Sequence, residues 1–464
     1  MLSTMHDHPT LIVPEQVLLP DGVHRGHAVL VDQGLITQVA PVEQLHGSAA
    51  TRVDLPGRLL MPGFVDAHHH LTQTFGKSLV FGEPSEIFRR VWVPMEQHMD
   101  EEAIEVAVQL AAWESLRGGF TTVADAGARI AGDLGQLAEV TERVGVRCVL
   151  GFICNDLNGP AVVSSEDEVL AGARRHLDRW HTRETVHPSL AISIPEAATD
   201  AVLTSVSSLA RDAGVPFQIH LNEHLAAIER SLEATGLRPL ERLAQLGALG
   251  PELLAAHSTL LTPHEIALLR DSGGAVSYNP VASSWKGNAI APALLLHELG
   301  VRVGLGTDGT RSDAFRLLDA AETAQRFGHS MAVGDSCAGG GWTWLDQGLR
   351  GGADAVGLAG RVGEISPGAY ADLLVVNTST PEFVPSWDLP WELVRLANRD
   401  QIETVIVHGK VRLVNGQPVD WDGAQLLDRA RAVSARVVSS SPIHTIDPSS
   451  GEHRSARSGT GARR

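Results

Sequence analysis

The stretch LLMPGFVDAHHH (59–70) joins an apolar run to three consecutive histidines, and seven similar apolar segments follow it along the chain. Between them lie stretches with apolar residues at helical spacing, such as EEAIEVAVQLAAWESLRGG (101–119). The strand candidates are LLMPGFVDAH (59–68), FTTVADAG (120–127), VRCVLGFI (146–153), LAISIP (190–195), PFQIHL (216–221), LLAAHS (253–258), GGAVSYNP (273–280) and RVGLGTDG (302–309). This alternation predicts an α/β fold, a (β/α)8 TIM barrel, with a doubly wound open sheet as the competing interpretation.

The two chain ends have a different texture from the middle. Residues 10–58 and 369–418 contain short alternating β segments with Gly and Pro between them. We expect residues 1–60 and 366–422 to form a small β-sandwich domain and residues 61–365 to form a catalytic barrel. Residues 423–464 are expected to be a helix followed by a disordered tail, because 439–464 are rich in Ser, Gly and Arg.

Composition excludes several classes of partner. The formal charge is -18 over 464 residues, which disfavours nucleic acid and an anionic membrane surface and suits a small neutral or cationic substrate. No apolar run is long enough to span a bilayer, and the N-terminal residues lack the pattern of a signal peptide. We therefore expect a cytoplasmic protein.

The cysteines do not form a disulfide framework. There are only three, and Cys148 and Cys154 flank one apolar run, where we expect them to be buried.

Side chains that bind metals recur where the predicted strands end. His68, His70, His220, His257 and Asp308 all take such positions, and the carboxyl ends of barrel strands share one rim. His68 and His70 are two residues apart on an extended segment, so they point the same way, while His69 points away. An HxH pair alone is also compatible with a solvated histidine cluster. The further rim residues favour one divalent metal ion, most simply zinc, with iron, cobalt or manganese as alternatives.

Three rim residues are candidates for proton transfer or substrate contact. Glu223 follows His220 by three residues and is suited to carry a proton to a leaving nitrogen. Its alternative role is structural, because a carboxylate at the N-terminus of a helix is stabilised by the helix dipole. His257 suits either a ligand or a contact to water and substrate. Asp308 suits a ligand and a base, or the cap of the next helix.

Several motifs resemble the amidohydrolase superfamily, over about residues 10–420. They are PGFVDAHHH (62–70), HLNE (220–223), AAHSTLL (255–261), SYNPVASSWKGNAIAP (277–292), VGLGTDG (303–309) and GEISPGAYADLLVVN (363–377). The chain is most similar to the branch of cytosine deaminase, triazine hydrolase, 8-oxoguanine deaminase and the adenosylhomocysteine deaminases. The resemblance implies metal at His68, His70, His220 and Asp308, with Glu223 as proton shuttle and His257 near the water and the substrate. It also implies a substrate contact at Gln73 and an assembly of two or four copies.

The chain departs from this branch in two places. Dinuclear members carry a carboxylated lysine at the end of strand four, but the three lysines, Lys77, Lys286 and Lys410, lie elsewhere, so one metal is expected. The substrate-binding histidine that nucleoside deaminases carry after strand four is missing. Glu196 lies there and either replaces that contact or faces solvent. Trp285, which precedes Lys286, either forms the floor of an apolar pocket or packs within its own loop.

Three hypotheses follow from the sequence. The first is hydrolysis of a C–N bond at an sp2 carbon of a small nitrogen heterocycle, with release of ammonia or an amine. The second is hydrolysis of a urea, carbamate or thiocarbamate, as in phenylurea and molinate hydrolases. The third is a barrel without catalytic activity. Convergent polar side chains in the pocket would favour the first hypothesis, and an apolar pocket around Trp285 the second.

Overall fold

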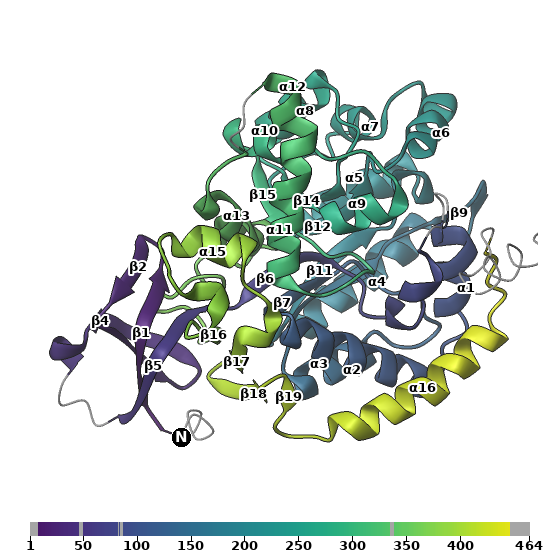
Figure 1. The fold of residues 1–464 in the computed structure, drawn as a ribbon. Coiled ribbons are helices and arrows are strands. Elements are labelled where there is room, and N and C mark those ends of the chain that lie inside the picture. Colours follow the sequence, from purple (N-terminus) through teal and green to yellow (C-terminus); the bar gives the residue numbers. More distant parts are fainter. Residues whose placement is uncertain (1–7, 46–49, 82, 84–86, 335–337, 446–464) are drawn as a thin grey trace, which may run out of the picture.

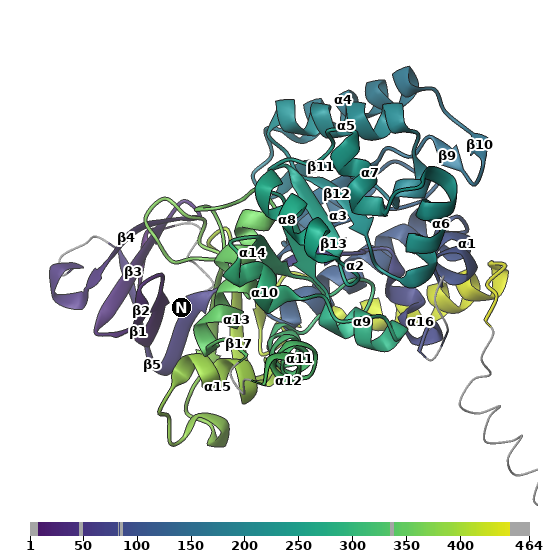
Figure 2. The ribbon, with the colours of Figure 1, turned by 90° about the horizontal axis from the view of Figure 1, so that it is seen from above.

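Eight parallel strands form the centre of the protein and confirm the predicted barrel. The computed structural model describes residues 8–45, 50–81, 83, 87–334 and 338–445. The strand order follows the sequence from one end of the barrel sheet to the other (Figures 1 and 2). The strands are β6 (Phe64–His69), β7 (Phe120–Asp125), β8 (Arg147–Ile153), β11 (Val186–Ile192), β12 (Phe217–Leu221), β13 (Leu253–His257), β14 (Ala275–Tyr278) and β15 (Arg302–Leu305).

The barrel closes between its first and last strands at the rim. Past the end of β15, the backbone N–H of Asp308 donates to the carbonyl of His68 at 2.8 Å, and a single bridge pairs His69 with Asp308. The Asp66 carboxylate reinforces this seam, because it accepts the backbone N–H of Thr307 at 2.9 Å. The closure therefore joins the two segments that were predicted to carry metal ligands.

Helices surround the barrel strands (Figure 2). Several begin with a side chain that accepts a backbone N–H of the first turn, as Ser165 and Glu168 do reciprocally in α4 and Thr262 and Glu265 do in α8. The principal helices are α2 (Glu101–Arg117), α3 (Gly135–Val144), α4 (Glu166–Trp180), α5 (Asp200–Ala213), α6 (Leu225–Thr235), α7 (Pro239–Gln245), α8 (Pro263–Ser272), α11 (Ala314–Gln325), α13 (Gly341–Gly348) and α14 (Arg350–Ala355).

The two chain ends form one separate sheet beside the barrel, as the sequence predicted (Figure 1). N-terminal and C-terminal strands meet where β5 pairs antiparallel with β16. The strands are β1 (Thr10–Leu19), β2 (Gly22–Arg25), β3 (His27–Asp32), β4 (Leu35–Pro41), β5 (Thr51–Pro62), β16 (Leu373–Asn377), β17 (Ile402–Val407), β18 (Lys410–Val414) and β19 (Gln417–Pro418). The chain passes from β5 into β6 at Gly63. A Cβ atom at this position would lie 2.0 Å from Thr121 Oγ1, so any larger residue would force Thr121 to move.

One predicted strand begins earlier than the sequence indicated. The fourth barrel strand was expected at 190–195, but β11 covers Val186–Ile192, and Pro195 begins a short 3-10 helix. Pro188 lies inside the strand, where a proline usually argues against one, and this obscured the true start.

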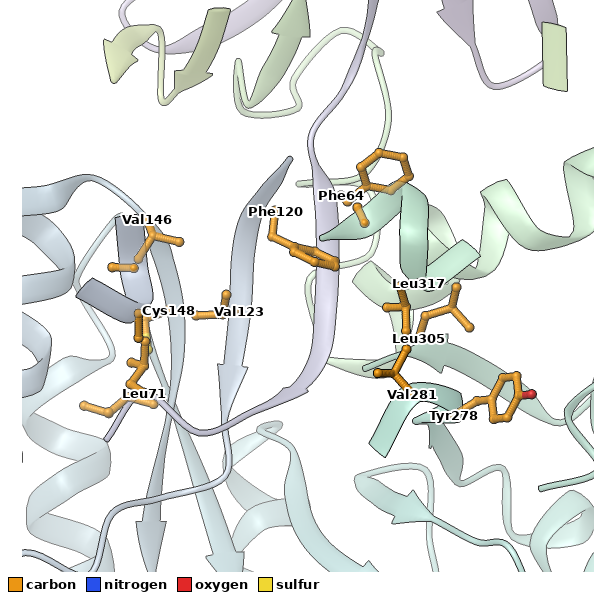
Figure 3. Packing of buried hydrophobic residues seen from close by; sticks show 14 of the residues in the cluster. Phe64, Leu71, Phe120, Val123, Val146, Cys148, Tyr278, Val281, Leu305 and Leu317 are labelled. Carbon is orange, nitrogen blue, oxygen red and sulfur yellow. The ribbon is translucent and has the colours of Figure 1, made fainter. Parts of the chain in front are cut away.

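Aromatic side chains fill the core near the seam. The Phe64 ring meets Phe315 edge-on at 5.4 Å and Phe120 at 6.4 Å between ring centroids; Phe64 and Phe120 are labelled in Figure 3. Cys148 in the same cluster and Cys154 are both buried, as predicted, and neither forms a disulfide.

The C-terminal helix α16 (Gly423–Ser440) lies along α2 on the outside of the barrel (Figure 1). Its Arg436 donates to Glu102 at 2.9 Å. Residues 446–464, most of the tail expected to be disordered, lie outside the described residues. Among the helices that the structure describes, none has the length and apolar character required to cross a membrane.

A buried ion pair connects the barrel to the sheet. Arg147 at the start of β8 binds Asp372, which precedes β16, through two hydrogen bonds of 2.9 and 3.1 Å. Both side chains are at most 1% exposed, and the guanidinium lies 3.9 Å from the centre of the Tyr370 ring. Asp372 also accepts the backbone N–H of His408 at 2.7 Å.

We expect the substitution Asp372→Ala to lower the free energy of unfolding by about 3–5 kcal/mol, because it leaves the Arg147 charge buried without its partner. Chemical denaturation measures the change. The matched control is Asp54→Ala, which removes an exposed pair with Arg52 and should leave stability essentially unchanged. Equal stability of the two variants would contradict a structural role for the buried pair.

Candidate metal centre

The candidate site lies at the rim where the barrel strands end. Four non-glycine residues adopt left-handed backbone conformations there: Asn222 (φ 49°), His257 (φ 72°), Ser258 (φ 50°) and Asp308 (φ 58°). Such conformations are uncommon for these residue types and cluster at functional sites. They turn the chain sharply just after the strands β12, β13 and β15.

Three candidate ligands, His68, His70 and Asp308, bring one ligand atom each within 4.8 Å of one another, and His220 adjoins this group through His70. His70 Nε2 lies 3.3 Å from His220 Nε2 and 3.4 Å from Asp308 Oδ1, and His68 Nε2 lies 3.9 Å from the same carboxylate oxygen. In a tetrahedral site with bonds of about 2.0–2.1 Å, ligand atoms are about 3.3–3.4 Å apart. His68 Nε2 is buried and has no hydrogen-bond partner among the described residues. The donor set and its spacing therefore fit a divalent cation.

The hydrogen bonds of two further ring nitrogens distinguish His220 from His257. His220 Nδ1 donates to the carbonyl of Ser193 at 2.7 Å, so Nε2 keeps its lone pair. His257 Nδ1 instead faces the amide Nδ2 of Asn279 at 3.2 Å, while Ser277 donates to the amide oxygen. His257 Nδ1 is thus an acceptor and Nε2 carries the proton. His257 lies close enough to His68 and His220 to share an ion, and its Nε2 has no hydrogen-bond partner among the described residues. With the Asn279 amide in this orientation, the tautomer favours a hydrogen-bond donor.

His69 faces a different set of partners from its neighbours. Its Nδ1 lies 2.9 Å from Thr307 Oγ1 and 3.3 Å from Asp66 Oδ2. Burial acts to lower the pKa of His69, but the bond to Asp66 and the negative charges of Asp66, Asp125 and Glu114 together outweigh it, and the net shift is upward. His69 therefore belongs to the seam and not to the group of candidate ligands.

The candidate ligand histidines are electrically neutral. Burial lowers the pKa of His68 well below its ordinary value, and the neighbouring His220 lowers it further. Burial also lowers the pKa of His70 well below the usual range and that of His220 to about 4. Neutral imidazole is the form that binds a metal ion.

Lys286 is the residue of the site that the sequence did not identify. Its Nζ donates to Glu223 Oε1 at 2.8 Å and to Asp308 Oδ2 at 2.7 Å. Sequence reasoning considered this lysine only as a bridge between two metals; its place in a loop after the seventh strand, at the same rim, was the available signal. Asn288 in this loop also donates to Glu223 Oε1, at 3.3 Å.

The charges of this group balance one another. Burial acts to raise the pKa of Glu223, but His257 and Lys286 outweigh it and the net shift is downward. Burial acts in the same way on Asp308, and Lys286 and His257 hold its pKa well below the usual range. The pKa of Lys286 is raised by the two carboxylates against the effect of its own burial. Both carboxylates are therefore ionised at neutral pH.

A cavity opens over these residues and encloses about 880 Å³, part of it open to solvent. Gln73 and Glu196, two predicted substrate contacts, line it together with Glu223 and Lys286. Glu196 forms an ion pair with Arg230 at 3.1 Å. Other polar lining residues are Arg129, Ser193, Asn222, His224 and Asn288.

Trp285 does not line this cavity. Its ring meets Phe81 edge-on at 4.4 Å, and it borders a smaller neighbouring cavity beside Asp308 and Gly309. Trp285 thus both packs against the Phe81 ring and borders a cavity next to Asp308, and its contact with a substrate stays a prediction.

Comparisons with known proteins agree with this geometry. The sequence profile of the Amidohydrolase family matches residues 59–412. The 5-methylthioadenosine/S-adenosylhomocysteine deaminase of Syntrophobacter fumaroxidans is 30% identical over 88% of this chain and 93% of its own length. The crystal structure of an adenosine deaminase from Xanthomonas campestris with bound zinc is 29% identical, with a TM-score of 0.85 over 93% of this chain and 98% of that chain.

A more distant structure shares the fold alone. The atrazine chlorohydrolase from Arthrobacter aurescens complexed with zinc is 20% identical, with a TM-score of 0.82 over 92% of this chain and all of that chain (100%). Taken with the family match over the whole barrel and the C-terminal strands β16 and β17 of the sheet, the comparisons establish the class of the protein. The chain belongs to the amidohydrolase family and is a metal-dependent hydrolase that acts on carbon–nitrogen bonds other than peptide bonds.

Proposed function

We propose that the protein is an aminohydrolase that removes an amino group from an sp2 carbon of a small nitrogen heterocycle. One divalent ion, zinc in the first instance and otherwise iron, cobalt or manganese, is held by His68, His70, His220 and Asp308. The observation that carries the proposal is the grouping of the His68, His70 and Asp308 ligand atoms, with His220 3.3 Å from His70, beside the carboxylate of Glu223 at one cavity. A divalent ion bound there lowers the pKa of a coordinated water to about 7 and so supplies a nucleophile at neutral pH.

The residues of the chain handle the protons of the reaction. Water adds its oxygen to the carbon, the C–N bond breaks, and the nitrogen leaves as ammonia. Asp308 accepts one proton from the attacking water. Glu223, which is ionised in the resting site, accepts the second proton and passes it to the departing nitrogen, and Asp308 returns its proton to the ring nitrogen as the C=O bond forms. Lys286 and Asn288 both donate to Glu223 Oε1, which orients the carboxylate. His257 directs its Nε2–H toward Glu223 and Asp308, at 3.9 and 3.8 Å.

The polar groups that converge in the cavity favour a heterocycle over a urea or carbamate, and the apolar side chains that also line it, Ile87, Phe88 and Trp92, suit the faces of a ring. Trp285, the expected centre of an apolar pocket, borders the smaller neighbouring cavity. Gln73 and Glu196 are proposed to contact the substrate. The relatives named as deaminases of adenosine derivatives support an aminated ring as substrate. The absence of a histidine after the fourth strand argues for a free base, a pyrimidine, a triazine or an oxopurine. An assembly of two or four copies and a cytoplasmic location stay predictions.

Ammonia release tests the proposal directly. We expect the zinc-loaded protein to release ammonia from at least one compound in a panel of amino-substituted triazines, pyrimidines, purines and purine nucleosides, because the cavity presents a nucleophile and a proton donor to an sp2 carbon. Coupled detection of ammonia and liquid chromatography of the products provide the measurement. Matched phenylureas and carbamates serve as controls. Turnover of only those controls would contradict the assignment and support the second hypothesis.

The two histidines with different tautomers should respond differently to substitution. We expect His220→Ala to reduce the bound metal to a small fraction of the wild-type content, because it removes a ligand atom. His257→Gln should retain about one metal per chain and lose activity, since on the assigned tautomer Nε2 of His257 carries a proton and offers no lone pair to a metal. Elemental analysis after dialysis gives the metal content of each variant. Loss of metal in His257→Gln would show that His257 is a ligand.

Substitution of Glu223 should impair proton transfer and leave metal binding unchanged. We expect Glu223→Gln to lower kcat/KM by about 10²–10⁴ at unchanged metal content, because the amide cannot shuttle a proton. Steady-state kinetics with the substrate found in the panel checks this. Glu233→Gln, an exposed glutamate on α6, is the matched control and should retain full activity. Wild-type kinetics in Glu223→Gln would remove Glu223 from the mechanism.

A further inference from the structure

A chain of hydrogen bonds runs along the rim to the candidate ligand His220, and Ser193 is its junction. The Ser193 carbonyl accepts from His220 Nδ1 at 2.7 Å, and its hydroxyl accepts from Asn155 Nδ2 at 3.0 Å and from Arg129 Nη2 at 3.2 Å. The Ser193 backbone N–H donates to Asn155 Oδ1 at 3.0 Å. Ser193 is 1% exposed, so these protein groups are its hydrogen-bond partners in place of bulk water.

Arg129 is fixed on its other side. Its Nη1 donates to Glu96 Oε2 at 3.1 Å, and its guanidinium lies 4.3 Å from the centre of the Phe88 ring. Glu96 is completely buried and also accepts from Thr72 Oγ1 at 2.6 Å. The Arg129 side chain is 10% exposed. A buried carboxylate and an aromatic face therefore hold the guanidinium in one orientation.

The network connects segments that the barrel ladder does not fix. β11 ends at Ile192, so Ser193 lies just beyond the regular strand, and its carbonyl accepts the His220 backbone N–H only at a long 3.4 Å. Thr72, Arg129 and Asn155 come from the loops after β6, β7 and β8. Side-chain hydrogen bonds thus replace the regular strand-to-strand backbone hydrogen bonds at Ser193, whose carbonyl sets the tautomer of His220.

We propose that Arg129 is a positioning residue: through the Ser193 hydroxyl it fixes the carbonyl that orients the His220 ring toward the metal. The inference rests on the proposed metal centre, and it assigns Arg129 no contact with the reacting atoms. The geometry of Nη1 and Nη2 explains why arginine serves here, because one planar group binds Glu96 and Ser193 together.

Metal affinity tests this inference without a substrate. We expect Arg129→Met to raise the dissociation constant for zinc about 10–100-fold, measured by competition with a chelator on the metal-free protein. Arg129→Lys should also weaken binding, because Glu96 and Ser193 bind two different nitrogens of one rigid planar group, and the single flexible Nζ of lysine does not reproduce that geometry. Cobalt(II) replacement should show an altered absorption spectrum in Arg129→Met, since His220 loses its fixed orientation.

The matched control is Arg242→Met. Arg242 is similarly buried, at 12% exposed, and holds the same loop through the carbonyls of Pro195 and Ala198, but it does not touch Ser193. We expect its zinc affinity to stay within about twofold of wild type. Thermal unfolding of the metal-free proteins shows whether both variants keep the fold.

A double substitution separates positioning from general destabilisation. We expect Ser193→Ala to weaken zinc binding as Arg129→Met does, and the double variant to show no further loss, because both remove one link of the same chain. Ser193→Ala also keeps the inference testable if Arg129→Met does not fold. Unchanged zinc affinity, full recovery in Arg129→Lys or additive losses would overturn the role of Arg129. Failure of the wild-type protein to bind zinc, cobalt, manganese or iron would instead overturn the proposed metal centre.

Discussion

The seam between the first and last barrel strands is the constraint on which the rest of the site depends. A backbone hydrogen bond of 2.8 Å from Asp308 to His68 sets the distance between two candidate ligands that are far apart in sequence. Asp66 secures it, because its carboxylate accepts the backbone N–H of both His68 and Thr307. Asp66 is completely buried. The remaining side chains of the site can converge only after this closure has placed the Asp308 carboxylate.

The site concentrates charge that burial alone would not tolerate. Glu223 and Asp308 are both ionised, and each would disfavour the other in the absence of compensation. Lys286 binds one oxygen of each carboxylate and leaves Asp308 Oδ1 directed at His70. In the proposed metal centre, one carboxylate would thus serve two positive partners at once, the metal ion on Oδ1 and the Lys286 ammonium on Oδ2. The loop that carries Lys286 is consequently part of the site and not only its cover.

Regular alternation made the barrel, the sheet of the chain ends and the rim residues predictable from sequence, since strand ends in a barrel share one side. His68 and His70 were placed by the two-residue repeat of an extended chain. Contacts made by side chains from irregular loops could not be predicted: Lys286 and Arg129 act through conformations that no local pattern encodes. The start of the fourth strand was hidden by Pro188. The tautomer of His257 required the position of Asn279, which only the folded chain reveals.

The pairing of β5 with β16 has a consequence for how the protein is made. Strand β5 ends at Pro62 and β16 begins at Leu373, so the ribosome synthesises the whole barrel between them. At about 5–20 residues per second, roughly 15–60 s pass before the second strand emerges. During this time one edge of β5 has no partner in the nascent chain, and such edges recruit strands from other molecules. The edge of β5 that faces β16 is therefore paired only late in biogenesis, after the barrel has been synthesised.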